Sequence, residues 1–254
     1  MPFVDVCGHR LEYERIELAR EGRPTLVFLH EGLGAMAMWK DFPSHVAHAT
    51  ACNAIVYSRY GYGNSEPLRV PREVRYMHDE ALLALPELLD KLAIESPVLV
   101  GHSDGGSIAL IHAGGSGRAV AGLVLMAPHV FVEDVSVANI VAARDAFETT
   151  DFRDKLARYH ADVESVFWSW NRIWLHPDFR NWNIEEYLPR ISCPVLAMQG
   201  EDDEYGTMDQ LSRIGRQVAD ADLLQLRDCR HSMHKDQPEA VIDAITRFVD
   251  RITA

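Results

Sequence analysis

A serine flanked by two glycines, in the run Gly101–Gly105 (Gly-His-Ser-Asp-Gly), is the side chain best placed to act as a nucleophile. The apolar stretch Pro97–Val100 precedes this run, and an alanine- and isoleucine-rich stretch follows it. These flanks predict a strand, a sharp turn and a helix, with the hydroxyl of Ser103 exposed at the turn. The two glycines allow the strand and the helix to approach closely. The N-terminus of the helix favours the negative charge that develops when a serine attacks a carbonyl group.

A serine nucleophile needs a histidine to accept its proton and a carboxylate to orient that histidine. The chain has 12 histidines, and the position of His231 favours it because it follows a strand-like run and precedes the last helical segment. We therefore expect His231 at the carboxyl end of a strand, on the same rim of the sheet as Ser103. The carboxylate is expected after the preceding strand, in the four consecutive acids Glu201–Glu204. The pattern alone does not choose among these four.

Acyl transfer also needs two backbone N–H groups to bind the oxyanion of the tetrahedral intermediate. One is expected from Asp104, whose side chain we interpret as suited to a helix N-terminus. The other is expected from the loop Leu29–Gly34, which follows an apolar run, with the N–H of Gly32 as the first choice. We interpret His30 as a residue that supports this loop through hydrogen bonds to the backbone.

The alternation of apolar runs with helical patterns predicts an α/β fold with a mainly parallel sheet and helices on both faces. A hairpin is expected from Phe3–Val6 and Leu11–Leu18, and a helix over Tyr76–Ala93 with a kink at Pro86. A last helix is expected from Pro238, with Asp236 and Glu239 at the spacing of a capping box. The remaining strands are expected at Thr25–Leu29, Ala54–Tyr57, Val98–Val100, Leu123–Met126, Val195–Met198 and Leu223–Leu226.

Residues 129–190 interrupt this alternation, because they hold no strand-like run and have the pattern of short helices. Four of the five tryptophans lie there, and one helical face carries Val163, Val166, Phe167, Trp170, Ile173 and Trp174. We predict a core of residues 1–128 and 191–254, with 129–190 inserted after the sixth strand as a small helical cap. Its aromatic side chains pack the insertion, line a substrate pocket, or do both. The residues expected to line that pocket are Leu33, His102, Trp168 and Trp174.

The composition limits the partners that this chain can have. It has 254 residues and a net charge of −13, with no basic stripe, so neither nucleic acid nor an anionic membrane surface is an expected partner. No apolar run approaches the length of a membrane span, and no signal-peptide pattern is present. We predict a cytoplasmic monomer or homodimer that acts on a small molecule. The four scattered cysteines are expected to be buried thiols.

The chain resembles the α/β-hydrolase family over nearly its whole length. The run Gly101–Gly105 resembles the nucleophile elbow of that family, and His30–Gly34 resembles its oxyanion loop. The segment Ser58–Ser65 is similar to the family's Arg-Gly-x-Gly-x-Ser segment. The resemblance selects Asp203 through the Gly-x-x-Asp turn, and His231 through its spacing to the last helix. The order serine, aspartate, histidine is also that of the family.

Two positions depart from the family pattern. Arg230 stands before the histidine, where glycine is frequent, and Glu31 stands in the oxyanion loop, where glycine is usual. An acid at position 31, beside Asp104, could make the pocket entrance electronegative, but we interpret Glu31 as pointing away and bonding locally.

The resemblance implies a serine hydrolase that cleaves a small carboxylic ester, lactone or thioester, without a metal ion or a cofactor. Family members that act on halides or epoxides carry an aspartate where this chain has Ser103. The aromatic cap suggests a substrate with an apolar or aromatic part. Three alternatives remain: a carbon–carbon bond hydrolase of the meta-cleavage type, an acyltransferase or perhydrolase, and a ligand receptor with a slow or vestigial triad.

Overall fold

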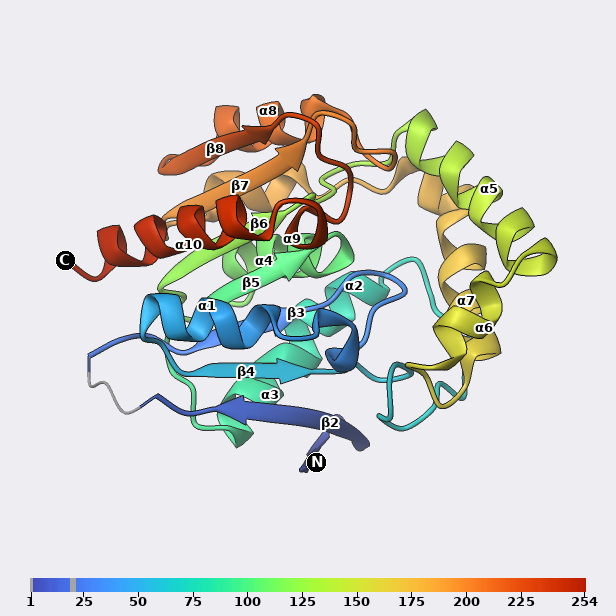
Figure 1. Ribbon diagram of the computed structural model, residues 1–254, viewed down its shortest axis with the longest axis horizontal. Helices are drawn as coiled ribbons and strands as arrows, with labels where there is room; N and C mark the ends of the chain where they lie inside the picture. Colours follow the sequence, from blue (N-terminus) through green and yellow to red (C-terminus); the bar gives the residue numbers. More distant parts are fainter. Residues whose placement is uncertain (1, 19–21) are drawn as a thin grey trace.

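An eight-stranded sheet in the order β1-β2-β4-β3-β5-β6-β7-β8 forms the centre of the molecule (Figure 1). The computed structural model describes residues 2–18 and 22–254, so Met1 and residues 19–21 of the predicted core lie outside the described residues. Strands β3 to β8 are parallel to one another, whereas β1 and β2 form an antiparallel hairpin at one edge. The predicted α/β fold with a mainly parallel sheet is confirmed.

The strands agree with the sequence prediction to within two residues at each end. They are β1 Phe3–Val6, β2 His9–Ile16, β3 Leu26–Leu29, β4 Ala54–Tyr57, β5 Val98–His102, β6 Gly122–Met126, β7 Val195–Gly200 and β8 Ala221–Leu226. The predicted hairpin turns at Cys7 and Gly8, which both have positive φ angles, as a tight two-residue turn requires.

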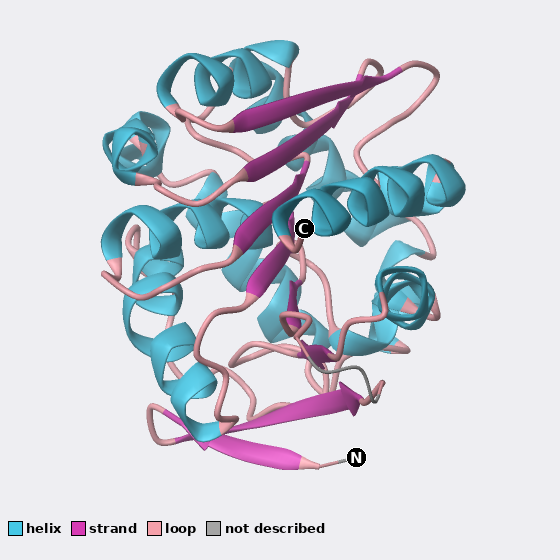
Figure 2. Ribbon diagram, turned by 90° about the vertical axis from the view of Figure 1, so that its left-hand side faces the viewer, coloured by secondary structure: helices cyan, strands magenta, loops and turns pink. Residues whose placement is uncertain are grey.

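Helices cover both faces of the sheet, which explains why its central strands are continuously apolar (Figure 2). Successive side chains of β3 alternate between two hydrophobic clusters: Val27 and Leu29 pack in one, and Leu26 and Phe28 in the other. The first cluster includes residues of α2 (Tyr76–Asp79), α3 (Leu85–Lys91), α4 (Asp104–Gly115) and α8 (Met208–Gln217). The second includes residues of η1 (Met36–Trp39), α1 (Phe42–Thr50), α9 (Met233–Asp236) and α10 (Pro238–Ile252).

Two local predictions need correction or refinement. The helix expected over Tyr76–Ala93 contains a π-helical turn, Glu80–Ala84, immediately before α3. Pro86 in the first turn of α3 lacks an N–H group, so the preceding turn cannot follow a regular α-helical ladder. The capping box predicted at α10 is wrong: the N-cap is Gln237, and the Asp236 carboxylate accepts the backbone N–H of Arg230 at 2.9 Å.

The 129–190 insertion contains three helices and two short 3-10 segments. These are α5 Asp134–Thr149, α6 Phe152–Ala157, α7 Val163–Trp174, η3 Pro177–Asn181 and η4 Glu185–Arg190. Helices α5, α6 and α7 lie together beyond the carboxyl ends of the parallel strands (Figure 1). Segment η4 returns to the core, where it packs against α4 and α8. The exact boundaries of the predicted cap stay a prediction.

Two further observations concern the surface and the thiols. None of the helices in the described parts of the chain is long and apolar enough to cross a bilayer. Cys52, Cys193 and Cys229 are buried as expected, but Cys7 is exposed at the hairpin turn, where it contacts the carboxylate of Glu87. The cytoplasmic location stays a prediction.

Candidate active site

Ser103 lies at the sharp turn between β5 and α4 in a strained backbone conformation, with φ 53° and ψ −118°. Few non-glycine residues adopt a positive φ, and such strain is frequently found at functional sites. The turn is held by a hydrogen bond from the Ser103 N–H to the carbonyl of Met126 at 2.9 Å. The flanking glycines are needed for close approach. A Cβ on Gly101 would collide with the backbone of α4, and one on Gly105 would collide with the carbonyl of Leu29 in β3.

Asp203 and His231 come from the loops after β7 and β8, and their side chains are hydrogen-bonded. Nδ1 of His231 lies 2.8 Å from Oδ1 and 3.0 Å from Oδ2 of Asp203. The carboxylate is held in turn by the side chain of Gln199 at 2.6 Å and the backbone N–H of Tyr205 at 2.8 Å. The structure therefore brings one of the four consecutive acids to the imidazole of His231. Glu204 instead accepts the backbone N–H of His231, at 3.2 Å.

The electrostatics of this pair suit a base. Burial lowers the pKa of His231, but the charge and the hydrogen bond of Asp203 outweigh burial, so the pKa lies above the ordinary value of 6.5. Burial also raises the pKa of Asp203, yet the facing imidazole leaves it below its ordinary value. Because Asp203 accepts the proton on Nδ1, Nε2 of His231 carries the free lone pair. Within the described chain, Ser103 Oγ donates no hydrogen bond to it, and such bonds often tighten only when substrate binds.

The two backbone donors expected for an oxyanion have no partner in the described part of the chain. The N–H of Asp104 is in the first turn of α4, where no intrahelical acceptor exists, and the N–H of Gly32 makes no backbone hydrogen bond. As expected, His30 supports the loop: it accepts the backbone N–H of Arg59 at 3.1 Å and contacts the carbonyl of Glu31 at 2.8 Å. The buried Arg59 guanidinium donates to the same carbonyl at 2.9 Å.

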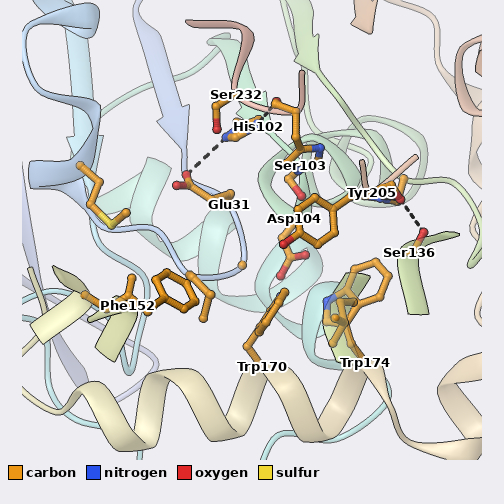
Figure 3. A pocket seen from close by; sticks show the side chains of 17 residues that line it. Glu31, His102, Ser103, Asp104, Ser136, Phe152, Trp170, Trp174, Tyr205 and Ser232 are labelled. Atoms are coloured by element: carbon orange, nitrogen blue, oxygen red, sulfur yellow. Dashed lines mark hydrogen bonds and ion pairs between the residues drawn. The ribbon is translucent and has the colours of Figure 1, made fainter. Parts of the chain in front are cut away.

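A cavity of about 200 Å³ joins these groups (Figure 3). Among the predicted site residues, Ser103, His231, Gly32, Asp104, Leu33, His102 and Trp174 line it. Asp203 lies behind His231, with a fully buried side chain. Trp168 does not line the cavity. Its indole N–H donates to Glu164 at 2.9 Å, and the guanidinium of Arg172 lies 5.5 Å above its ring, on a separate surface hollow.

The family of this chain follows from its match to a protein-family model. The model described as "Alpha/beta hydrolase family" matches residues 26–244. The chain belongs to the alpha/beta hydrolase family. A comparison with curated protein sequences gives no significant match.

Solved structures show the same fold at low sequence identity. One is a thermophilic esterase from Thermogutta terrifontis, with a TM-score of 0.77, 19% identity, and coverage of 100% of this chain and 99% of that chain. An enol-lactonase from Burkholderia xenovorans has a TM-score of 0.77 and 20% identity, with coverage of 98% and 100%. A meta-cleavage product hydrolase from Pseudomonas fluorescens has a TM-score of 0.76 and 19% identity, with coverage of 99% and 98%. At this identity, the likeness concerns the fold alone.

The cavity of this alpha/beta hydrolase has further lining residues that sequence reasoning did not select. They are Glu31, Met38, His129, Ser136, Ile140, Phe152, Leu156, Trp170, Tyr205 and Ser232. The helical pattern could have indicated Trp170, because Trp170 and Trp174 share the buried face of α7, whereas Trp168 does not lie on that face. His129 and Tyr205 follow β6 and β7, so their place at the carboxyl ends of strands could also have indicated them.

Two interpretations of acidic side chains need correction. Glu31 does not point away: it lines the cavity, where its carboxylate lies 3.4 Å from Nδ1 of His102. Burial raises the pKa of Glu31, but the contact with His102 outweighs it and holds the pKa well below the ordinary value. The side chain of Asp104 does not simply suit a helix N-terminus. It is buried, lines the cavity, and accepts the hydroxyl of Tyr76 at 2.6 Å.

Proposed function

We propose that this alpha/beta hydrolase is a serine hydrolase that cleaves a small carboxylic ester, lactone or thioester through an acyl-enzyme on Ser103. The observation that carries the proposal is the Asp203–His231 hydrogen bond at 2.8 Å, beside the cavity that Ser103 lines. In this proposal, residues 129–190 act as a cap, and α7 supplies Trp170 and Trp174 to the cavity wall. The small cavity volume favours a compact acyl group.

Acylation uses the free lone pair on Nε2 of His231. The imidazole accepts the Ser103 proton while Oγ attacks the carbonyl carbon, and Asp203 stabilises the imidazolium that forms. The backbone N–H groups of Gly32 and Asp104 bind the oxyanion. Collapse of the tetrahedral intermediate breaks the bond to the alcohol or thiol, which leaves with the proton from Nε2.

Deacylation repeats these steps with water as the nucleophile. His231 accepts a proton from water, which attacks the acyl carbonyl, and then returns that proton to Ser103 Oγ as the acid leaves. The same residues can in principle cleave a carbon–carbon bond beside a ketone. The ester assignment rests on a nucleophile, a base and two N–H donors without partners in the described part of the chain, which form a complete set for acyl transfer, and the carbon–carbon bond hydrolase is the alternative.

The test uses Ser103→Ala and a matched surface variant, Ser212→Ala, on the exposed side of α8. Ser103→Ala should abolish turnover of p-nitrophenyl acetate and labelling by a fluorophosphonate, whereas Ser212→Ala should keep both. Retained turnover in Ser103→Ala would overturn the assignment. Stoichiometric labelling of Ser103 without turnover of any ester in a panel would favour a ligand receptor instead.

A further inference from the structure

Asp104, the residue after the proposed nucleophile, lines the cavity and has a buried carboxylate oxygen without a partner among the described residues. Asp104 is 1% exposed and lines the same cavity as Ser103. Oδ2 accepts one hydrogen bond, from Tyr76, whereas Oδ1 is buried and has no partner among the described residues. Burial of an acceptor without a partner is costly, and most buried polar atoms are satisfied. Oδ1 is therefore a candidate contact for a ligand.

The direction of the Tyr76 hydrogen bond fixes the role of Asp104 as an acceptor. The indole N–H of Trp174 can only donate, and it donates to the Tyr76 oxygen at 3.1 Å. The Tyr76 hydroxyl proton is thus available for Asp104. Burial and the negative charge of Asp104 raise the pKa of Tyr76 well above its ordinary value, so the phenol stays neutral. Asp104 therefore accepts a hydrogen bond from the neutral phenol of Tyr76, and this contact brings no positive charge to the carboxylate.

Glu31, which lines the cavity, and Asp203, which lies behind His231, have basic partners, and Asp104 does not. Glu31 faces His102, and Asp203 is paired with His231. Asp104 makes no ion pair within the described ranges, and neither lysine nor arginine is among the residues that line the cavity there. Burial lowers the pKa of Arg59, but nearby charges, that of Asp104 among them, raise it. The side-chain hydrogen bonds of Arg59 in the described part of the chain nevertheless go to His30 and to the carbonyl of Glu31, and its guanidinium lies over the ring of Tyr62.

The surroundings of Asp104 suit a cation with several hydrogens to donate. Figure 3 shows the carboxylate between Ser103 and the rings of Trp170 and Trp174, whose faces can attract a cation. His129 also lines the cavity and provides a second acceptor without a partner among the described residues. Its Nε2 lies 3.1 Å from the carbonyl oxygen of Tyr205 and donates to it, so Nδ1 is an acceptor that receives no hydrogen bond. A group that donates hydrogen bonds and carries positive charge matches this set.

On the basis of the proposed acyl transfer at Ser103, we propose that Asp104 binds a primary ammonium group on the acyl part of the substrate, so that aminoacyl esters are the preferred class. Ser103 and Asp104 are adjacent, with Cα atoms about 3.8 Å apart. Oδ2 of Asp104 lies 3.2 Å from the position that a Cβ on Gly32 would take, beside the expected oxyanion site. An ammonium group on the carbon next to a carbonyl bound at that site would therefore lie beside the Asp104 carboxylate.

The experiment compares L-alanine benzyl ester with benzyl propionate, which differ only by the ammonium group, and follows release of benzyl alcohol. Because the ammonium group also activates the ester chemically, the readout is the change in the ratio of the two kcat/KM values between variants. Asp104→Asn should lower that ratio about 10- to 100-fold, the loss expected for one hydrogen bond to a charged group. Asp202→Asn removes the same charge from an exposed residue of the acidic turn and should leave the ratio unchanged.

A second measurement does not depend on turnover or on the folding of the Asp104 variant. Ser103→Ala should bind L-alanine benzyl ester at least about tenfold more tightly than benzyl propionate in calorimetric titration. Equal binding of the two esters, or an Asp104→Asn variant that slows both equally, would overturn the ammonium subsite. If neither ester is hydrolysed but Ser103→Ala still prefers the alanine ester, the subsite stands and the proposed hydrolase activity fails.

Discussion

Nε2 of His160 and the carbonyl oxygen of Leu33 lie 3.0 Å apart, and this hydrogen bond joins the insertion to the loop that holds Gly32. Nδ1 of the same ring accepts the backbone N–H of Gly63 at 3.0 Å, so Nε2 carries the proton and donates to Leu33. The neighbouring Ala161 N–H donates to the carbonyl of Gly63 at 2.9 Å. One buried histidine thus fixes the loop that holds Gly32 and the insertion relative to each other.

His160→Ala should therefore lower both kcat and stability, because it leaves a buried N–H and a partly buried carbonyl without partners. Each unsatisfied group costs about 1–3 kcal/mol. We expect a fall of about tenfold in kcat for p-nitrophenyl acetate and a lower urea midpoint. His160→Gln offers one donor and one acceptor and should restore part of both losses. A variant with reduced stability but unchanged kcat would show that His160 only anchors the insertion.

Asp203→Asn should change both the rate and its pH dependence. In the proposed mechanism neutral His231 is the base, so kcat/KM should rise with pH through the raised pKa of His231, above 6.5. The Asp203 charge and hydrogen bond cause that rise in pKa, and burial alone lowers it. Asp203→Asn should thus lower kcat by as much as about 10⁴-fold and move the acidic limb of the residual activity to lower pH.

The matched control for that prediction is Asp202→Asn, one residue earlier in the exposed part of the turn. Its pH–rate profile should coincide with that of the unchanged protein. If Asp202→Asn reduces kcat and Asp203→Asn does not, the carboxylate has been assigned to the wrong residue of the turn. An acidic limb that stays in place in Asp203→Asn would mean that another group sets the pH dependence.

Features that repeat along the chain were predictable from the sequence. The central strands were found because burial on both faces makes them continuously apolar, as in Ala54–Tyr57. The turn at Ser103 was found because two glycines, a preceding strand and a following helix are needed together for one geometry. These signals are local, so a single sequence carries them.

Contacts between distant segments were harder to predict. The side chain of Asp104 contacts Tyr76, 28 residues earlier in the chain, and that tyrosine contacts Trp174, 98 residues later. The pattern of α7 did distinguish the buried face, with Trp170 and Trp174, from the side that carries Trp168. It could not show that this face is turned toward Ser103, because that depends on how the insertion docks on the core.

The glycines of the turn give a prediction about packing rather than chemistry. Gly105→Ala places a methyl group against the backbone carbonyl of Leu29, which cannot move without distorting β3. Gly106→Ala, one residue later, places it 3.0 Å from the side chain of Pro128, a tight but less rigid contact. Overpacking usually costs about 1–3 kcal/mol, partly offset by a gain of about 1 kcal/mol in helix propensity. We expect Gly106→Ala to fold with a loss of stability within that range, and Gly105→Ala to lose more than about 3 kcal/mol or fail to fold.

Urea denaturation followed by circular dichroism measures the stability of both variants. Equal stabilities would mean that the strand and helix are not in the close contact on which the position of Ser103 depends.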